Sequence, residues 1–196
     1  MLTNTNRFYN RFFLFYPLVD LFLKRHKLAL YAAINALPSG RLLDIGVGNG
    51  ADLAKYERHH ITGIDNSSKM LEKAQAKKIP NIELLKMDAN ELAFPDEHFS
   101  YVVLSHVIAV VKDPEQLLGE IYRILKPGGQ LFILNHITPD NALRYVDRCF
   151  QPFAKLFHFN SYFTLNSLQT LQQFQLLQET TFGKLSYFKL LVYCKP

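Results

Sequence analysis

The feature that most constrains the fold of this chain is an apolar run at residues 42–45 that leads directly into three glycines within five residues. These glycines are Gly46, Gly48 and Gly50, in the stretch Gly-Val-Gly-Asn-Gly. Glycine permits a tight turn and lets the backbone approach a ligand closely. A strand that ends in such a turn is typical of nucleotide-binding α/β proteins, although the spacing differs from that of the dinucleotide fingerprint.

Three acidic residues follow or end successive predicted strands. Asp44 lies in the first strand, just before the glycines, where a carboxylate favours a cationic or hydrogen-bond-donating ligand over a pyrophosphate. Asp65 ends the next strand, about 20 residues after the loop, where it can accept ribose hydroxyls, and Asp88 follows the third strand. Each acid alone is more often a helix cap or a turn former. Together they are expected to converge on one crevice.

Strand-like and helix-like runs alternate from residue 41 onward, which predicts βαβ units and a parallel sheet with helices on both faces. Strands are expected at 41–45, 61–65, 82–87, 99–105, 130–135, 176–181 and 188–194. Helices are expected at 51–58, 67–78, 114–125 and 165–174. The last two strands are joined by 182–187 alone, which is too short for a helical crossover, so they should run antiparallel.

The first 40 residues do not follow this alternation. Aromatic and apolar residues recur there at helical spacing, and Pro17 within the run predicts two short helices or a kink. The length of 196 residues suits a single domain. We therefore expect one domain over 1–196, in which a helical cap at 1–40 covers the active site of a core at 41–196.

Four motifs in the core can now be compared with a known family. LLDIGVGNG, GIDNSSKML, MDANELAFPDEHFSYVVLSHV and LKPGG resemble, in this order, the motifs of class I S-adenosylmethionine (SAM) dependent methyltransferases. The resemblance covers roughly residues 41–137. It implies an enzyme with SAM as cofactor and a Rossmann-like, doubly wound, seven-stranded, mostly parallel sheet with an N-terminal helical extension.

The resemblance also implies where the cofactor binds. The loop around Gly46, Val47, Gly48 and Gly50 would lie against the methionine moiety, with Asp44 near its amino group and Ser105 contributing backbone. Asp65 would bind the ribose, and the adenine would lie among Asn66, Met70, Asp88 and Ala89.

Within that class the chain most resembles bacterial phospholipid N-methyltransferases that act on phosphatidylethanolamine. The residues behind this are SHVIAVVKDPEQLLGEIYRILKPGG, ILNHI and the N-terminal segment FYNRFFLFYPLVD. The last departs from the usual pattern, since Tyr9-Asn10 and Tyr16-Pro17 stand where Tyr-Asp is common. The quinone C-methylating branch is similar in the same motifs and stays open as an alternative, as does methylation of another small molecule.

Methylation of a primary amine requires that the amine first lose a proton. His106 and His136 follow two predicted strands at the edge where ligands bind, so they are the candidate catalytic residues. A pocket-shaping role for His106 and a supporting hydrogen bond for His136 stay open. His26, His59, His60, His98 and His158 are interpreted as surface residues. The candidate substrate-binding residues are Tyr9, Tyr16, Asn135, Arg144 and Arg148.

The net charge of +5 is unevenly distributed. Residues 1–40 and 141–196 each carry a formal +4, which leaves −3 for the middle. This pattern fits peripheral contact with an anionic membrane at the cytoplasmic face, or a solvated surface without a partner. No appended RNA-binding module is apparent, so no nucleic acid is expected, and the two distant cysteines lack metal-site spacing. A SAM-binding protein without catalysis is a further, less favoured reading.

Overall fold

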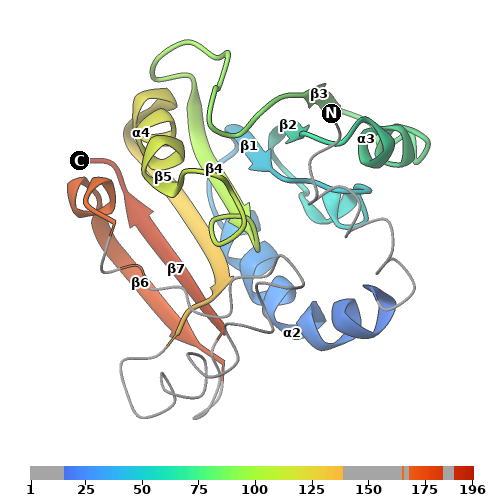
Figure 1. Cartoon of the computed structure of the whole chain (residues 1–196), viewed down its shortest axis with the longest axis horizontal. Helices are drawn as coiled ribbons and strands as arrows, with labels where there is room; N and C mark the ends of the chain where they lie inside the picture. The colour runs from blue at the N-terminus through green and yellow to red at the C-terminus, as the bar shows by residue number, and fades with distance from the viewer. Residues whose placement is uncertain (1–15, 139–164, 166–167, 183–187) are drawn as a thin grey trace.

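The computed structural model describes residues 16–138, 165, 168–182 and 188–196, with side chains from His26 onward. Figure 1 shows a seven-stranded sheet in the order β3-β2-β1-β4-β5-β7-β6. The strands are β1 (Arg41–Ile45), β2 (His60–Asp65), β3 (Ile82–Lys86), β4 (Phe99–Ser105), β5 (Leu125–His136), β6 (Gln175–Thr181) and β7 (Phe188–Cys194). Strands β1 to β5 pair in parallel, and β7 is inserted antiparallel between β5 and β6. The predicted Rossmann-like topology is confirmed.

Alternate residues of the central strands pack into two separate hydrophobic cores, one on each face of the sheet. One core contains Leu43, Val102 and Ile133 together with α4 (Pro114–Ile124), whose leucine and isoleucine side chains are fully buried. The other contains Leu42, Val103 and Phe132 together with Leu30 and Ile34 of α2 (Tyr16–Asn35). Since neighbouring residues of a strand point to opposite faces, helices cover both faces, as predicted.

Helix α2 is continuous from Tyr16 to Asn35. The residues before Tyr16 lie outside the described part of the chain, so the two short helices or the kink expected around Pro17 stay a prediction. Pro17 is the second residue of α2, and a proline in the first turn removes no intrahelical hydrogen bond. Helix α3 (Ser68–Gln75) begins where expected, because the Ser67 hydroxyl accepts a hydrogen bond from the Met70 amide at 3.4 Å.

The helix expected at 51–58 is wrong. One turn of 3₁₀ helix, η1 (Leu53–Lys55), is all that forms, and Tyr56 is already extended. Residues 46–59 must contain both the glycine loop and the return to the start of β2, which leaves no length for a full helix. Similarly, the described part of the segment expected as a helix at 165–174 ends in the 3₁₀ turn η3 (Thr170–Gln173).

Strand β5 begins five residues earlier than expected, at Leu125, and so includes the Lys-Pro-Gly-Gly sequence that lies between the expected helix and strand. The β4–β5 register shifts between Phe99 and Tyr101, so this sequence forms an irregular start of the strand. Gly128 has φ +75°, and its amide donates to the Lys195 carbonyl at 2.8 Å. The chain end is thereby hydrogen-bonded to the amino end of β5.

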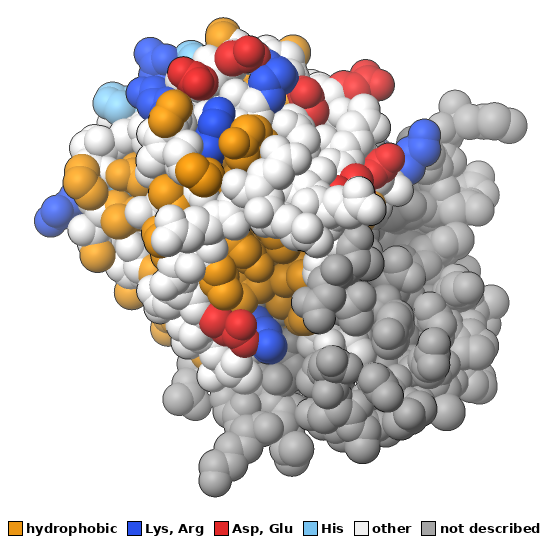
Figure 2. Space-filling view, turned by 90° about the vertical axis from the view of Figure 1, so that its left-hand side faces the viewer, with side chains coloured by type: hydrophobic (Ala, Val, Ile, Leu, Met, Phe, Trp, Pro, Cys, Tyr) orange, Lys and Arg blue, Asp and Glu red, His pale blue; other side chains and the backbone are white. Residues whose placement is uncertain are grey.

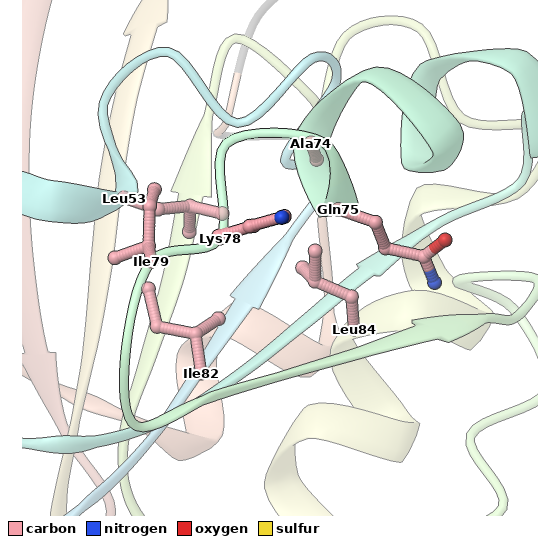
Figure 3. Close-up of a pocket in the computed structure, with 7 residues that line it drawn as sticks. All are labelled: Leu53, Ala74, Gln75, Lys78, Ile79, Ile82 and Leu84. Carbon is pink, nitrogen blue, oxygen red and sulfur yellow. The ribbon is translucent and has the colours of Figure 1, made fainter.

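A pocket of about 240 Å³ lies beside η1, the short 3₁₀ turn that stands in place of the expected helix (Figure 3). Its lining comes from η1, from the end of α3, from the connection after α3 and from β3: Leu53, Ala74, Gln75, Lys78, Ile79, Ile82 and Leu84. Asp65 and Asp88, in contrast, lie at or after the carboxyl ends of their strands. The pocket is therefore distinct from the edge at which a cofactor is expected.

The edge strand β6 exposes apolar side chains. Leu176 and Leu177 are 47% and 49% exposed, and Lys189 of β7 pairs with Glu179 at 2.6 Å. Figure 2 shows the side of the molecule that carries β6, with hydrophobic side chains gathered near its middle.

In the described part of the chain, no helix is both long enough and apolar enough to cross a membrane.

Arg123 of α4 should stabilise the segment that follows β3. Its guanidinium donates to the carbonyls of Leu92 and Phe94 at 2.8 and 2.7 Å, and it pairs with Glu120 and Asp96. We expect Arg123→Ala to lower the free energy of unfolding, because several hydrogen bonds are lost. The loss should be about 1–3 kcal/mol, since partial exposure of the guanidinium lets water replace some of these bonds. Urea denaturation measures this, with the exposed Arg58→Ala as control, expected within about 0.5 kcal/mol of wild type. Equal effects of the two variants would contradict the prediction.

Candidate active site

The loop between β1 and η1 is hydrogen-bonded to the end of β2. The amides of Gly46 and Val47 both donate to the Ile64 carbonyl, at 2.8 and 3.1 Å. Gly46, Gly48 and Gly50 have φ values of +78°, +56° and +67°, a region that disfavours side chains. The sequence forms this turn because glycine stands at each position that requires a positive φ.

The three glycines face different surroundings. A Cβ atom on Gly46 would lie 2.5 Å from Cγ2 of Val107, and one on Gly50 would lie 2.8 Å from Cβ of Ala74. A Cβ on Gly48 would meet nothing within 4 Å. Gly46 and Gly50 thus allow close packing of the loop on the protein, whereas Gly48 borders open space.

Val47 turns its side chain away from that space. A Cβ on Gly63 of β2 would lie 2.8 Å from Cγ1 of Val47, so the valine packs directly over the strand. Any contact between Val47 and a ligand is therefore made by its backbone.

Asp65 links the glycine loop to the start of α3. Its Oδ2 accepts a hydrogen bond from the Gly48 amide and its Oδ1 accepts one from the Ser67 amide, both at 2.8 Å. A carboxylate offers about four acceptor positions, so further donors can still bind. The residue therefore fixes the loop and retains capacity for a ligand.

The other residues predicted for the adenosine end lie nearby. The Met87 amide donates to the Asp65 carbonyl at 3.2 Å, so the chain leaves β3 beside Asp65. Asp88 is exposed, and its Oδ1 accepts from the Asn90 amide at 2.9 Å. Asn66 is exposed, Met70 is half-buried at the start of α3, and Ala89 packs against the core next to α4.

Asp44 is almost fully buried beside the loop. The Tyr56 hydroxyl donates to its Oδ2 at 3.0 Å. Burial raises the pKa of Asp44 to about 7, although the Tyr56 hydrogen bond acts in the opposite direction. Near neutral pH this carboxyl is therefore divided between its charged and neutral forms.

His106 and His136 lie together at the carboxyl ends of β4 and β5. His106 has φ +61°, and its amide donates to the Leu134 carbonyl at 2.7 Å. His136 is paired with Phe188 in the antiparallel β5–β7 register. Each imidazole ring contacts the Phe188 ring, and the distance from the imidazole centroid to the phenyl centroid is 5.7 Å in both cases.

Ser105 and Asn135 accompany these histidines. Ser105 is half-buried and pairs with Leu134, while Asn135 is 3% exposed and donates from Nδ2 to the His136 carbonyl at 2.8 Å. The Asn135 side chain therefore supports the end of β5. Tyr9, Arg144 and Arg148 lie outside the described residues, as does the side chain of Tyr16, whose backbone begins α2.

The prediction that His26 and His59 lie on the surface is wrong, because each is 6% exposed. His26 of α2 packs on Phe182 and Phe188, and His59 contacts the Ile34 carbonyl through Nε2 at 3.1 Å. The signal for His26 was its spacing of four and eight residues from the buried Leu30 and Ile34, which places it on the buried face of the helix. His98 is half-buried beside Arg41, His60 is exposed, and His158 lies outside the described residues.

Comparison with known proteins identifies the family. A family model described as a methyltransferase domain matches residues 43–133. A phosphatidylethanolamine N-methyltransferase of Cereibacter sphaeroides is 38% identical over 141 residues, 68% of this chain and 69% of that protein. The chain belongs to the SAM-dependent methyltransferases.

Another relative of this methyltransferase matches over a shorter part of its length, and a solved structure matches over almost its whole length. A demethylmenaquinone methyltransferase of Listeria welshimeri is 42% identical over 85 residues, 41% of this chain and 36% of that protein. A solved SAM-dependent methyltransferase of Thermotoga maritima, 25% identical, superposes with a TM-score of 0.72 over 97% of this chain and 99% of that one. The enzyme's cofactor is SAM.

The residues of the methyltransferase fit this cofactor. Gly48 leaves open space beside the loop, and Asp65 keeps acceptor positions for the hydroxyls of a ribose. Asp44 and the loop lie next to each other at the end of β1, where an amino acid moiety would need a partner for its ammonium group. The individual contacts remain predictions.

We expect Gly48→Val to abolish SAM binding in calorimetry. The added side chain would occupy the open space and would also be strained at φ +56°, at a cost of about 1–2 kcal/mol in stability. The control is Gly119→Val in α4, where a Cβ also meets nothing within 4 Å. That variant should bind SAM normally, and normal binding by Gly48→Val would show that the loop does not face the cofactor.

Asp44 should make stability depend on pH. Its pKa rises from the ordinary 3.8 to about 7, so the folded protein holds a proton that the unfolded chain loses. The free energy of unfolding should therefore fall as pH rises between these values, by at most about 1.4 kcal/mol per pH unit. In Asp44→Asn this slope should flatten, and the variant should be more stable than wild type above pH 7. Denaturant titrations across this range, with exposed Glu83→Gln as control, test the prediction, and an unchanged slope in Asp44→Asn contradicts it.

Proposed function

We propose that this methyltransferase N-methylates the amine headgroup of a phospholipid such as phosphatidylethanolamine. The observation that carries the proposal is the extent of the match to the Cereibacter sphaeroides enzyme. That match spans 69% of the relative, against 36% for the Listeria welshimeri demethylmenaquinone methyltransferase. The Vibrio vulnificus ubiquinone/menaquinone biosynthesis C-methyltransferase matches this chain over nearly the same length, 140 against 141 residues, but at 30% identity against 38%.

The two histidines supply the chemistry that an amine acceptor needs. An ammonium has no lone pair, so a base must remove a proton before the nitrogen can attack a methyl group. An imidazole titrates near neutral pH and is suited to this step. We assign it to His136, with His106 shaping the pocket, because His136 is held by the β5–β7 pairing and by Asn135.

Bound SAM supplies a methyl group already activated on its sulfonium. The protein's own task is to align the acceptor and to exclude water, and positioning of this kind can contribute about 7–11 kcal/mol. In this proposal the glycine loop, Asp65 and Asp88 hold the cofactor, and the residues at the ends of β4, β5 and β7 receive the acceptor. We also propose that residues 1–40, which include all of α2, form a cap within the same domain.

Methylation of a quinone precursor is the second candidate. The Listeria relative is more identical to this chain, at 42%, over its shorter match. A ubiquinone/menaquinone biosynthesis C-methyltransferase of Vibrio vulnificus is 30% identical over 140 residues, half of its length. A carbon acceptor also needs deprotonation, so the histidines alone do not separate the two candidates.

An assay with methyl-labelled SAM separates them. We expect the wild-type protein to label phosphatidylethanolamine in vesicles, and not demethylmenaquinone that is kept reduced to its nucleophilic quinol in the same vesicles. In His136→Gln the turnover number should fall by about 10²–10⁴-fold, because general-base catalysis is lost while SAM still binds. The exposed His60→Gln is the matched control and should retain activity. Label in the quinone alone would make the second candidate the function.

We also propose peripheral contact with the anionic inner face of the cytoplasmic membrane. The protein should bind anionic vesicles more strongly than neutral ones, and salt should release it, because each Lys or Arg near such a surface contributes about 1 kcal/mol. Arg144→Ala combined with Arg148→Ala should weaken vesicle binding and lipid turnover without changing SAM affinity. The pair Lys77→Ala with Lys78→Ala, two exposed cations of the middle segment, is the control. Failure of the wild type to bind anionic vesicles at low salt in co-sedimentation would refute the proposal.

A further inference from the structure

A third histidine lies in the same ring cluster as the two candidate catalytic histidines. His26 of α2 stacks on Phe188 with ring centroids 5.0 Å apart and an interplanar angle of 20°. Its ring also meets Phe182 edge-on at 4.6 Å. His106 and His136 approach Phe188 at steep angles of 77° and 73°. One phenyl ring therefore joins imidazoles from α2, from the end of β4 and from the end of β5.

The cluster adjoins the glycine loop. Val107, the residue after His106, is the side chain that a Cβ on Gly46 would strike at 2.5 Å. Phe188 stands opposite His136, because antiparallel β7 begins at the edge where β5 ends. Asp65 and Asp88 lie on the other side of β1, at β2 and β3. If the adenosine of the cofactor lies at these acids, the histidine cluster is on the opposite side of β1, where a methyl acceptor can approach.

Lys27, the next residue of α2, pairs with Asp52 at 2.8 Å, and Asp52 lies two residues after Gly50. The helix also packs against β5 and β7. Two adjacent residues of α2 thus contact the two halves of the site. Lys27 contacts the chain just after the glycine loop, and His26 contacts the ring cluster where β4 and β5 end and β7 begins. This arrangement fixes the position of the His26 ring relative to the loop.

We propose that His26 is a positioning residue for the methyl acceptor, and that Phe188 is the wall on which the three imidazoles are arranged. Packing alone would be served at lower cost by leucine or phenylalanine, because a buried imidazole loses its hydration. An imidazole in this place can instead orient a polar headgroup or hold a neighbouring histidine in position. The inference rests on the methyltransferase activity, and it applies to an amine or a quinone acceptor alike.

Two substitutions of His26 and one matched control test the proposal. His26→Phe keeps an aromatic ring, whereas His26→Gln keeps a polar group. His59→Gln removes a histidine that is equally buried and that contacts α2 at the Ile34 carbonyl, but whose ring packs on Tyr101. Each variant is measured for SAM affinity by calorimetry, for thermal stability, and for KM and kcat with vesicle phosphatidylethanolamine and, separately, with demethylmenaquinone.

We expect both His26 variants to lose about tenfold to a hundredfold in kcat/KM for the acceptor, as misplacement of a reacting group does. SAM affinity should stay within about twofold, which a general loss of structure would not allow. His59→Gln should lower the thermal midpoint and leave KM and kcat for the acceptor unchanged. Unchanged acceptor kinetics in both His26 variants, or full activity in His26→Phe, would overturn the proposal, because ring packing alone would then explain the residue.

A second measurement keeps the test independent of which acceptor is right. Imidazole resonances of the wild-type protein are recorded by NMR with lysophosphatidylethanolamine and with demethylmenaquinone, and the His26 signal is identified by its absence in His26→Phe. We expect one of these acceptors to shift the His26 signal and to leave that of His59 in place. If the phospholipid takes no label and causes no shift, the proposed function fails while the quinone measurement still tests His26. Absence of a shift with both acceptors overturns the role of His26.

Discussion

The structure depends on the hydrogen bonds that hold the glycine loop against the end of β2. Two loop amides share the Ile64 carbonyl, and the Gly48 amide binds the Asp65 carboxylate. These bonds are possible only because the glycines adopt positive φ, which brings consecutive amides to the same side. The loop is thereby fixed by the protein before any ligand arrives, so little ordering cost remains for cofactor binding.

The region that we propose for the acceptor depends on a different constraint, the antiparallel insertion of β7. Because β7 runs opposite to β5, its first residue, Phe188, lies at the edge of the sheet where β5 ends with His136. A parallel strand in that place would present its last residue there instead. The reversal thus brings an aromatic side chain from near the end of the chain next to His26, from near its beginning.

Topology and the glycine loop could be predicted from the sequence, since strand alternation and the short link at 182–187 are local signals. The helix at 51–58 could not be excluded, because its residues suit a helix and only the distance back to the start of β2 prevents one. The burial of His26 was also missed. A histidine among Lys24, Arg25 and Lys27 suggests a solvated face, and the helical spacing of His26 from Leu30 and Ile34 was the only local signal against this. The rings that cover His26, Phe182 and Phe188, come from the other end of the chain. Non-local contacts of this kind leave little trace in a single sequence.

The two halves of the site are also divided along the sequence. The methyltransferase family model matches residues 43–133, which include the glycine loop, Asp65 and Asp88. His26, His136 and Phe188 all lie outside that range. Membership of the family therefore determines the cofactor, whereas three of the four rings in the cluster that we propose for the acceptor lie outside the matched range, with His106 inside it. Since one phenyl ring contacts all three histidines, the proposed role of His26 implies that a change at Phe188 or in α2 alters acceptor geometry without disturbing the loop. In such a division, relatives can share the cofactor and differ in the molecule they methylate.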